Sequence, residues 1–210
     1  MALFQGKYRI ESARLKGFDY SSPGSYFVTI DTEGMIWWFG DVANGQMKLS
    51  QIGEIVAEEW LKTPTIRPTV TLDEWRVMPN HMHGIIMIHE SKSAASSGQI
   101  PFVDWEKSFV VPIVETTDPV VSTGMTPAGK PKPKLKPNSL GSILGQFKSK
   151  CTSRIHDEGF ADFQWQERFH DRIIRDEGEL DRIRQYIIDN PLNWETDSRK
   201  ARKWKTQRFE

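Results

Sequence analysis

Two histidines separated by one residue are the first feature of this sequence that could carry out chemistry. His81 and His83 flank Met82 in the segment MPNHMHGIIMI. Side chains two residues apart in a β-strand point to the same face of a sheet. Two imidazoles on one face can hold a divalent cation. Because the pattern is short, two ordinary strand histidines near a turn remain the alternative interpretation.

A tyrosine late in the chain could supply a nucleophile. Tyr186 and Asn190 lie four residues apart in the segment LDRIRQYIIDNP, whose spacing predicts a helix, so the two side chains share one face. Tyr186 falls at the border of the apolar stripe, which predicts an exposed hydroxyl. A cation near that hydroxyl and near a phosphate would favour nucleophilic attack. The alternative is a border tyrosine, with Asn190 ending the helix before Pro191.

Strands and helices that could position these residues alternate along the chain. Hydrophobic periodicity and turn residues predict strands at 25–31, 70–78, 81–89 and about 171–174, and helices at 50–62, about 139–158 and 179–189. A short strand or hairpin arm is also expected at 35–39, before the turn signal Asn44-Gly45. The order predicts an α+β protein with a ferredoxin-like split β-α-β-β-α-β antiparallel sheet. A C-terminal helix would follow the sheet and carry Tyr186.

Composition changes mark the boundaries of the expected domain. Residues 1–22 are interpreted as an N-terminal lead-in and residues 23–194 as a single catalytic domain. Residues 90–137 are rich in Ser, Thr, Gly and Pro and end in the alternating segment KPKPKLKP, which predicts a mobile insertion. Residues 195–210 form a basic tail.

Cysteine content and hydropathy exclude several classes of protein. The single cysteine, Cys151, excludes an internal disulfide framework and a multi-cysteine metal site. No apolar run is long enough to cross a bilayer, and the first residues lack the pattern of a signal peptide. We therefore expect a cytoplasmic protein that does not associate with membranes.

The distribution of charge says more about partners than the net charge of zero. Residues 1–129 hold 10 Lys/Arg against 15 Asp/Glu, whereas residues 130–210 hold 18 against 13. A basic segment of this kind can follow a phosphate backbone. We expect Lys148, Lys150 and Arg154, on one predicted helix, to contact DNA. Solvent-facing helix charges are the alternative interpretation.

Taken together, three segments resemble the single-tyrosine HUH transposases, in particular the REP-associated tyrosine transposases. They are MPNHMHGIIMI, GQFKSKCTSRI and WQERFHDRIIRDEGELDRIRQYIIDNP, and the resemblance runs from about Gly24 to Trp194 with the insertion between. The HUH motif corresponds to His81-Met82-His83. The resemblance implies that Tyr186 is the nucleophile and that Asn190 is the third metal ligand beside the two histidines.

The resemblance also implies a reaction. Tyr186 would attack a phosphodiester of single-stranded DNA, form a 5′-phosphotyrosine and release a 3′-OH, so that strands can later be rejoined without ATP. The implied cofactor is a divalent metal, Mg²⁺ or Mn²⁺. The implied partner is single-stranded DNA with hairpin structure, and a homodimer is compatible with the resemblance.

Two other functions are kept as alternatives. One is a non-catalytic nucleic-acid-binding module of the same fold, although the Gly-rich aromatic strand motif of RNA-recognition modules is absent from the sequence. The other is a replication-initiator-type HUH nuclease, which differs in the order of its elements and usually carries further domains.

Overall fold

A four-stranded antiparallel sheet forms the centre of this computed structural model, which describes residues 17–90 and 136–196. The strand order is β4-β5-β1-β6, with β1 at Gly24–Asp31, β4 at Val70–Met78, β5 at His81–Ile88 and β6 at His170–Ile174. Helix α1 (Gln51–Leu61) connects β1 to β4, and α3 (Leu140–Asp157) precedes β6. The predicted ferredoxin-like split β-α-β-β-α-β plan is therefore confirmed.

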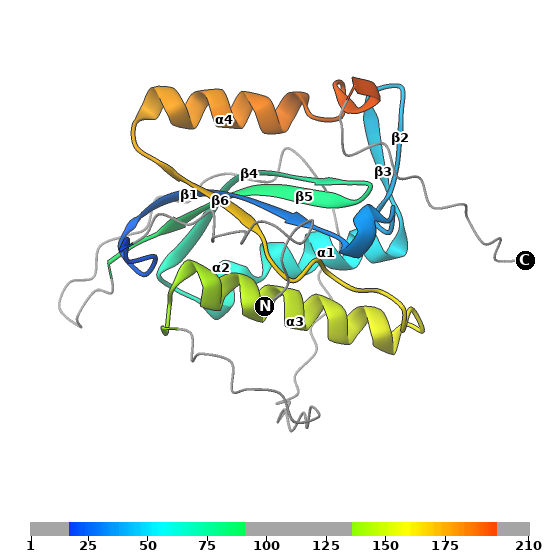
Figure 1. The fold of residues 1–210 in the computed structure, drawn as a ribbon, viewed down its shortest axis with the longest axis horizontal. Coiled ribbons are helices and arrows are strands. Elements are labelled where there is room, and N and C mark those ends of the chain that lie inside the picture. The colour runs from blue at the N-terminus through cyan, green and yellow to red at the C-terminus, as the bar shows by residue number, and fades with distance from the viewer. Residues whose placement is uncertain (1–16, 91–135, 197–210) are drawn as a thin grey trace, which may run out of the picture. The chain divides into compact units, whose positions relative to one another are not determined.

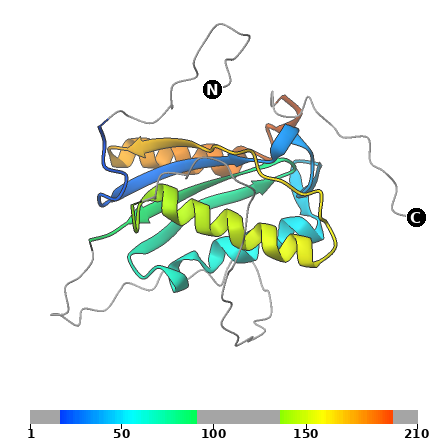
Figure 2. The ribbon, with the colours of Figure 1, turned by 60° about the horizontal axis from the view of Figure 1, so that its bottom comes forward.

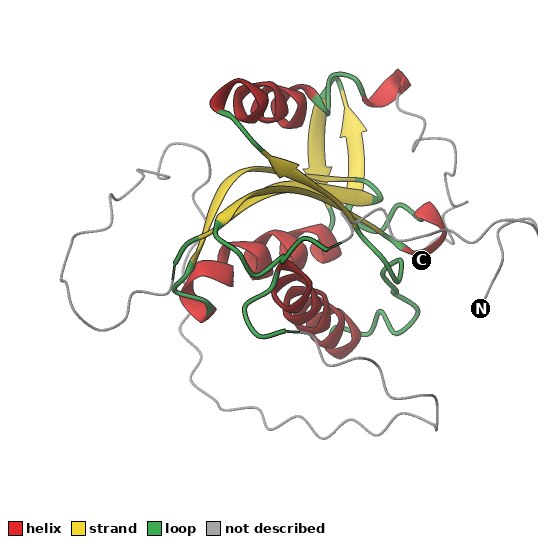
Figure 3. Cartoon of the chain, turned by 60° about the vertical axis from the view of Figure 1, so that its left-hand side comes forward, coloured by secondary structure: helices red, strands yellow, loops and turns green. Residues whose placement is uncertain are grey.

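Helices cover both faces of the sheet. Figure 1 shows α4 (Glu177–Asp189) on one face and α1 and α3 on the other. Figure 3 shows the sheet edge-on between these two layers, and Figure 2 shows α3 lying along the face opposite α4. Capping side chains stabilise the first turns of α1, α3 and α4. Ser50, Ser139 and Asp176 each accept a hydrogen bond from the third backbone N–H that follows.

Alternation along the strands decides which side chains face α4. Met82 is fully buried in the large core that β1, β4 and β5 form with α1 and α3, so its neighbours His81 and His83 face α4. Gly84 allows the ring of Trp60 to approach β5, because a Cβ at position 84 would lie 2.4 Å from that ring. The smaller core beneath α4 contains Ile85 of β5 and Ile187 of α4.

The strand predicted at 35–39 is wrong. A 3-10 turn, η1 (Glu33–Met35), occupies this part of the chain. Met35 has a φ of 59°, which is incompatible with a strand. Phe39 is fully buried. The hairpin follows instead, as β2 (Gly40–Ala43) and β3 (Gln46–Leu49) around the predicted Asn44-Gly45 turn.

Pro64 follows soon after the end of α1 at Leu61. It lies in the first turn of a separate short helix, α2 (Thr63–Ile66), where a missing N–H costs nothing. None of the helices in the described ranges has the length and apolarity that a membrane span requires. Most of the predicted insertion, of the predicted tail and of the predicted lead-in falls outside the described residues.

Candidate active site

The two histidines of the segment His81-Met82-His83 face each other on β5. Both side chains are buried, and their Nε2 atoms lie 3.1 Å apart. Two nitrogens that bind one metal at about 2.1 Å and at a right angle are separated by roughly 3 Å. The pair therefore has the spacing of two adjacent ligands of a single cation.

The other ring nitrogens of the histidines are held by neighbouring side chains. His81 Nδ1 lies 2.8 Å from Asn80 Oδ1, and His83 Nδ1 lies 2.8 Å from Thr29 Oγ1. Partners of this kind orient the rings of metal-binding histidines. Sequence reasoning missed both residues. Asn80 adjoins the motif in sequence, whereas Thr29 is found only from the register that pairs it with His83.

Tyr186 reaches the histidine pair from α4. Its hydroxyl lies 3.3 Å from His83 Nε2, and its ring packs at right angles to the ring of Phe27 on β1. The side chain is 45% exposed. The hydroxyl is thus next to a ring nitrogen of His83, on a side chain that is partly open to solvent.

Asn190 ends α4 and is 97% buried, with 3% of its surface exposed. Its Oδ1 is buried and has no hydrogen-bond partner among the described residues. Asn190 lies one helical turn after Tyr186, the residue that contacts His83. It also lies four residues before Trp194, and the ring centroids of Trp194 and His81 are 6.0 Å apart. Burying an unsatisfied carbonyl costs about 1–3 kcal/mol. A cation within reach of this oxygen would offset that cost.

The chemistry of the donors fits one divalent ion. No group of three or more His, Cys, Asp or Glu residues with metal-binding geometry exists in the ranges that the structure describes. Two imidazoles and an amide oxygen are neutral ligands, so a cation here would keep its full positive charge. Such a site would attract phosphate oxygens as further ligands.

An open hollow of about 230 Å³ adjoins the Tyr186 side chain. Its walls come from β1, β5, β6 and α4, and they consist of Phe27, Thr29, His83, His170, Asp171, Arg172 and Tyr186. His170 lies in the same cross-strand row as Thr29 and His83. Its side chain is 63% exposed, with Nε2 3.9 Å from Asp31 Oδ2. From the sequence, His170 is compatible with either a core or a site position, and the structure places it beside the candidate nucleophile.

The three predicted DNA-contacting residues lie on α3, on the opposite face of the sheet from α4. Lys148 Nζ donates to Gln166 O at 2.5 Å, and burial lowers the pKa of this ammonium group. Arg154 forms ion pairs with Glu58 and Glu59 of α1. The structure therefore does not bring these residues to the histidine pair, and it engages two of them in internal contacts.

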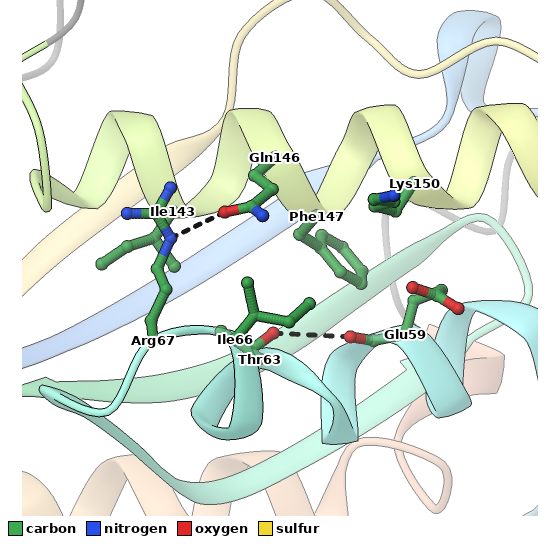
Figure 4. Close-up of a pocket in the computed structure, with 8 residues that line it drawn as sticks. All are labelled: Glu59, Thr63, Ile66, Arg67, Ile143, Gln146, Phe147 and Lys150. Atoms are coloured by element: carbon green, nitrogen blue, oxygen red, sulfur yellow. Dashed lines mark hydrogen bonds between the residues drawn. The ribbon is translucent and has the colours of Figure 1, made fainter. Parts of the chain in front are cut away.

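Lys150 lies in a small hollow between α3 and the helices α1 and α2. Figure 4 shows it near Glu59 and Phe147, with Arg67 bonded to Gln146 further along the same groove. The hollow holds only about 10 Å³, no more than a single water molecule needs. It is a packing gap between helices and not a ligand site.

The fold is similar to that of a solved REP-associated tyrosine transposase bound to a REP hairpin, with a TM-score of 0.50 and 16% sequence identity. The match covers 88% of this chain and 74% of that one. The fold is thus that of a tyrosine transposase, as the sequence motifs predict. A Deinococcus radiodurans R1 structure matches with a TM-score of 0.41 and 11% identity, over 85% and 97% of the two chains, which is too distant to support an argument.

A relative in Haemophilus influenzae defines the family more directly. The chain is 33% identical over 192 residues to an uncharacterized protein of that organism, which covers 91% of this chain and 93% of the relative. The chain belongs to the same family as this protein. No family model matches it.

Proposed function

We propose that this protein is a transposase-like enzyme that cleaves single-stranded DNA through Tyr186 and transfers the resulting strand. The observation that carries the proposal is the position of the Tyr186 hydroxyl, 3.3 Å from His83 Nε2. That nitrogen in turn faces His81 Nε2. A nucleophile, a candidate cation site and an open hollow thus meet at one end of α4.

The reaction balances with the groups at hand. Tyr186 loses its hydroxyl proton to solvent, and its oxygen forms a bond to the phosphorus of a DNA phosphodiester. The bond from phosphorus to the 3′-oxygen breaks, and that oxygen takes up a proton as a free 3′-OH. An incoming 3′-OH can then attack the phosphotyrosine and release Tyr186, so that the number of phosphodiester bonds is conserved.

The cation belongs to the proposal as well. His81, His83 and Asn190 would hold Mg²⁺ or Mn²⁺, and the bound ion would supply charge neutralisation at the reacting phosphate. The chain's own groups do the rest. The cross-strand register fixes the positions of the histidines. The apolar cluster that contains Ile85 and Ile187 fixes the distance between α4 and the sheet.

The hollow beside Tyr186 is the route by which we propose the strand enters. His170 and Arg172 are 63% and 67% exposed and provide hydrogen-bond donors at the edge strand β6. The solved transposase of similar fold is bound to a REP hairpin, which supports a hairpin-containing single strand as the substrate. Lys150 remains a candidate for contacts outside the site.

Covalent capture tests the proposal. The protein is incubated with labelled hairpin-containing single-stranded DNA and Mn²⁺, and SDS-stable adducts are resolved on a gel. We expect an adduct with the wild type and none with Tyr186→Phe, a substitution that removes only the hydroxyl. Tyr20→Phe is the matched control, because Tyr20 packs beside Phe18 and Tyr26, in the core on the other face of the sheet.

An adduct with Tyr186→Phe would exclude Tyr186 as the nucleophile. DNA binding without any adduct, in the wild type and with either metal, would instead support the non-catalytic binding module. The replication-initiator alternative would use the same phosphotyrosine chemistry and differs in the order of its elements, so a second labelled strand with a free 3′-OH tests only whether the cleaved strand is transferred.

A further inference from the structure

The ring nitrogens turned away from the candidate cation site have partners of two different kinds. His81 Nδ1 contacts the side-chain carbonyl of Asn80, whereas His83 Nδ1 contacts the hydroxyl of Thr29, both at 2.8 Å. A carbonyl oxygen only accepts hydrogen bonds, whereas a hydroxyl can donate or accept. This difference decides where each imidazole can carry its proton.

The orientation of the Asn80 amide is fixed by the turn around it. Asn80 is fully buried, and its Nδ2 donates to the carbonyl of Met35 at 3.1 Å, which leaves Oδ1 on the side of His81. Its backbone carbonyl accepts from Thr32 N and Oγ1. Met35 adopts a left-handed φ of 59°, a conformation that costs on the order of 1 kcal/mol outside glycine. The surrounding turn therefore holds Met35 in a strained backbone conformation, and the carbonyl of Met35 accepts the hydrogen bond that orients the Asn80 amide.

The fixed amide sets the state of His81. With Asn80 Oδ1 as acceptor, the ring carries its proton on Nδ1, and the lone pair of Nε2 points toward His83 Nε2, 3.1 Å away. Two lone pairs at this distance repel unless a proton or a cation lies between them. Without a cation, His83 must therefore carry its proton on Nε2 and donate it to His81, while Thr29 donates to His83 Nδ1.

With a cation between the two Nε2 atoms, His83 must carry its proton on Nδ1 instead. The Thr29 hydroxyl then accepts where it previously donated, so the same 2.8 Å contact serves both states. The His83 ring keeps one proton throughout. The exchange between its two tautomers leaves the charge of the protein unchanged.

We propose that Asn80 is a positioning residue that locks the tautomer of His81, and that Thr29 is a positioning residue that lets His83 exchange tautomers as the cation enters and leaves. The inference rests on the proposed cation site and adds two residues to it. The two roles differ, because His81 always presents the Nε2 lone pair to a cation, whereas His83 does so only after its proton moves to Nδ1.

Nitrogen-15 NMR of the imidazole rings tests this directly. Metal-free wild type should show His81 protonated on Nδ1 and His83 on Nε2. Zn²⁺, a diamagnetic probe with a preference for imidazole, should move His83 alone to the Nδ1 form. In Asn80→Ala, His81 should populate both tautomers, and the Zn²⁺ affinity measured by calorimetry should fall about 10- to 100-fold.

Two further variants separate positioning from simple folding. Asn80→Asp keeps an oxygen acceptor and should restore the His81 tautomer and most of the Zn²⁺ affinity, although it loses the bond to Met35. Thr29→Val should leave metal-free His83 on Nε2 and lower the affinity by a similar factor, because the Nδ1–H form loses its acceptor. Thr71→Val is the matched control, since Thr71 contacts His89 outside the site at 2.7 Å.

Several outcomes would overturn the inference. An Asn80→Ala protein with His81 still on Nδ1 and unchanged Zn²⁺ affinity would do so, as would metal-free wild type with both rings in the same tautomer. If Asn80→Ala does not fold, Asn80→Asp carries the test, and His81 protonated on Nε2 in that variant contradicts the proposal. These measurements need no DNA, so the expected tautomers without any cleavage would count against the proposed function alone.

Discussion

The two faces of the sheet are built in different ways. Between the sheet and the helices α1 and α3 lies a large core of aliphatic and aromatic side chains, among them Trp60 and Phe147 with their rings at right angles. Between the sheet and α4 only a small cluster is buried, formed by Ile85, Ile174, Leu180 and Ile187. Phe27, Met87 and Ile183 pack against this cluster, and the histidine pair lies on the same face of the sheet.

This difference indicates that the face covered by α1 and α3 contributes most of the stability, whereas the face covered by α4 carries the candidate active site. The large core fixes the strands, so the register that brings Thr29 opposite His83 does not depend on α4. Helix α4 is held by few apolar contacts and by ion pairs such as Arg184–Asp73. An element with little buried apolar area opens at lower free energy than the core. We therefore expect α4, with Tyr186, to be the part that moves when DNA enters.

The largest expected effect lies in the core between the sheet and the helices α1 and α3. Trp60→Ala should lower the free energy of unfolding by about 3–5 kcal/mol, because it removes a fully buried ring that packs against Gly84 and Phe147. Urea denaturation monitored by circular dichroism measures the change. A loss below about 1.5 kcal/mol would show that this core can collapse around the cavity, and the proposed contrast between the faces would be weakened.

A smaller effect is expected for the ion pair that tethers α4 to β4. Arg184 donates from Nε and NH2 to the Asp73 carboxylate at 2.8 and 2.6 Å. Arg184→Met should lower the free energy of unfolding by about 1 kcal/mol, in line with a partly exposed pair. The yield of the covalent DNA adduct should fall further than this loss of stability alone would explain. Arg182→Met is the control, because Arg182 lies exposed on the same helix. Equal adduct yields in the two variants would contradict a tethering role.

The same ion pair should make the tether sensitive to acid. The hydrogen bond from Arg184 lowers the pKa of Asp73 from its ordinary 3.8. A carboxyl group with a lowered folded-state pKa stabilises the fold fully above 3.8 and loses that contribution as the pH falls through the folded value. As the pH falls below 3.8, wild type should therefore lose more stability than Arg184→Met. Parallel losses in denaturation experiments would rule out this linkage.

The smallest expected effect lies at the edge strand. His170→Ala should weaken the binding of single-stranded DNA about threefold, the scale of one exposed polar contact, and should leave the unfolding free energy unchanged. Fluorescence anisotropy with labelled DNA measures the affinity, and His156→Ala on α3 is the matched control. Equal losses for both variants would show that the hollow beside Tyr186 is not the route of the strand.

Much of the fold follows from local patterns that the chain states clearly. The strand at 70–78 and the helices that begin near residues 50 and 139 follow from hydrophobic periodicity and turn residues, which act within a few residues. The wrong strand at 35–39 illustrates the limit of such patterns. Its aromatic residues suit a strand, but the positive φ of Met35 and the burial of Phe39 depend on contacts with the distant Pro79-Asn80 turn.

The candidate site shows the same division. The sequence by itself indicated His81, His83, Tyr186 and Asn190. Strand and helix periods place each pair on a shared face, and the resemblance of the motifs to single-tyrosine HUH transposases implies their roles. Only the tertiary structure brought Tyr186 to His83, 103 positions apart in the chain. It also added Thr29 and Asn80 to the site and placed the lysines and arginine of α3 on the other side of the sheet. The physical reason is that residue type and spacing fix which side of an element a group occupies, whereas strand register and helix packing decide what that side meets.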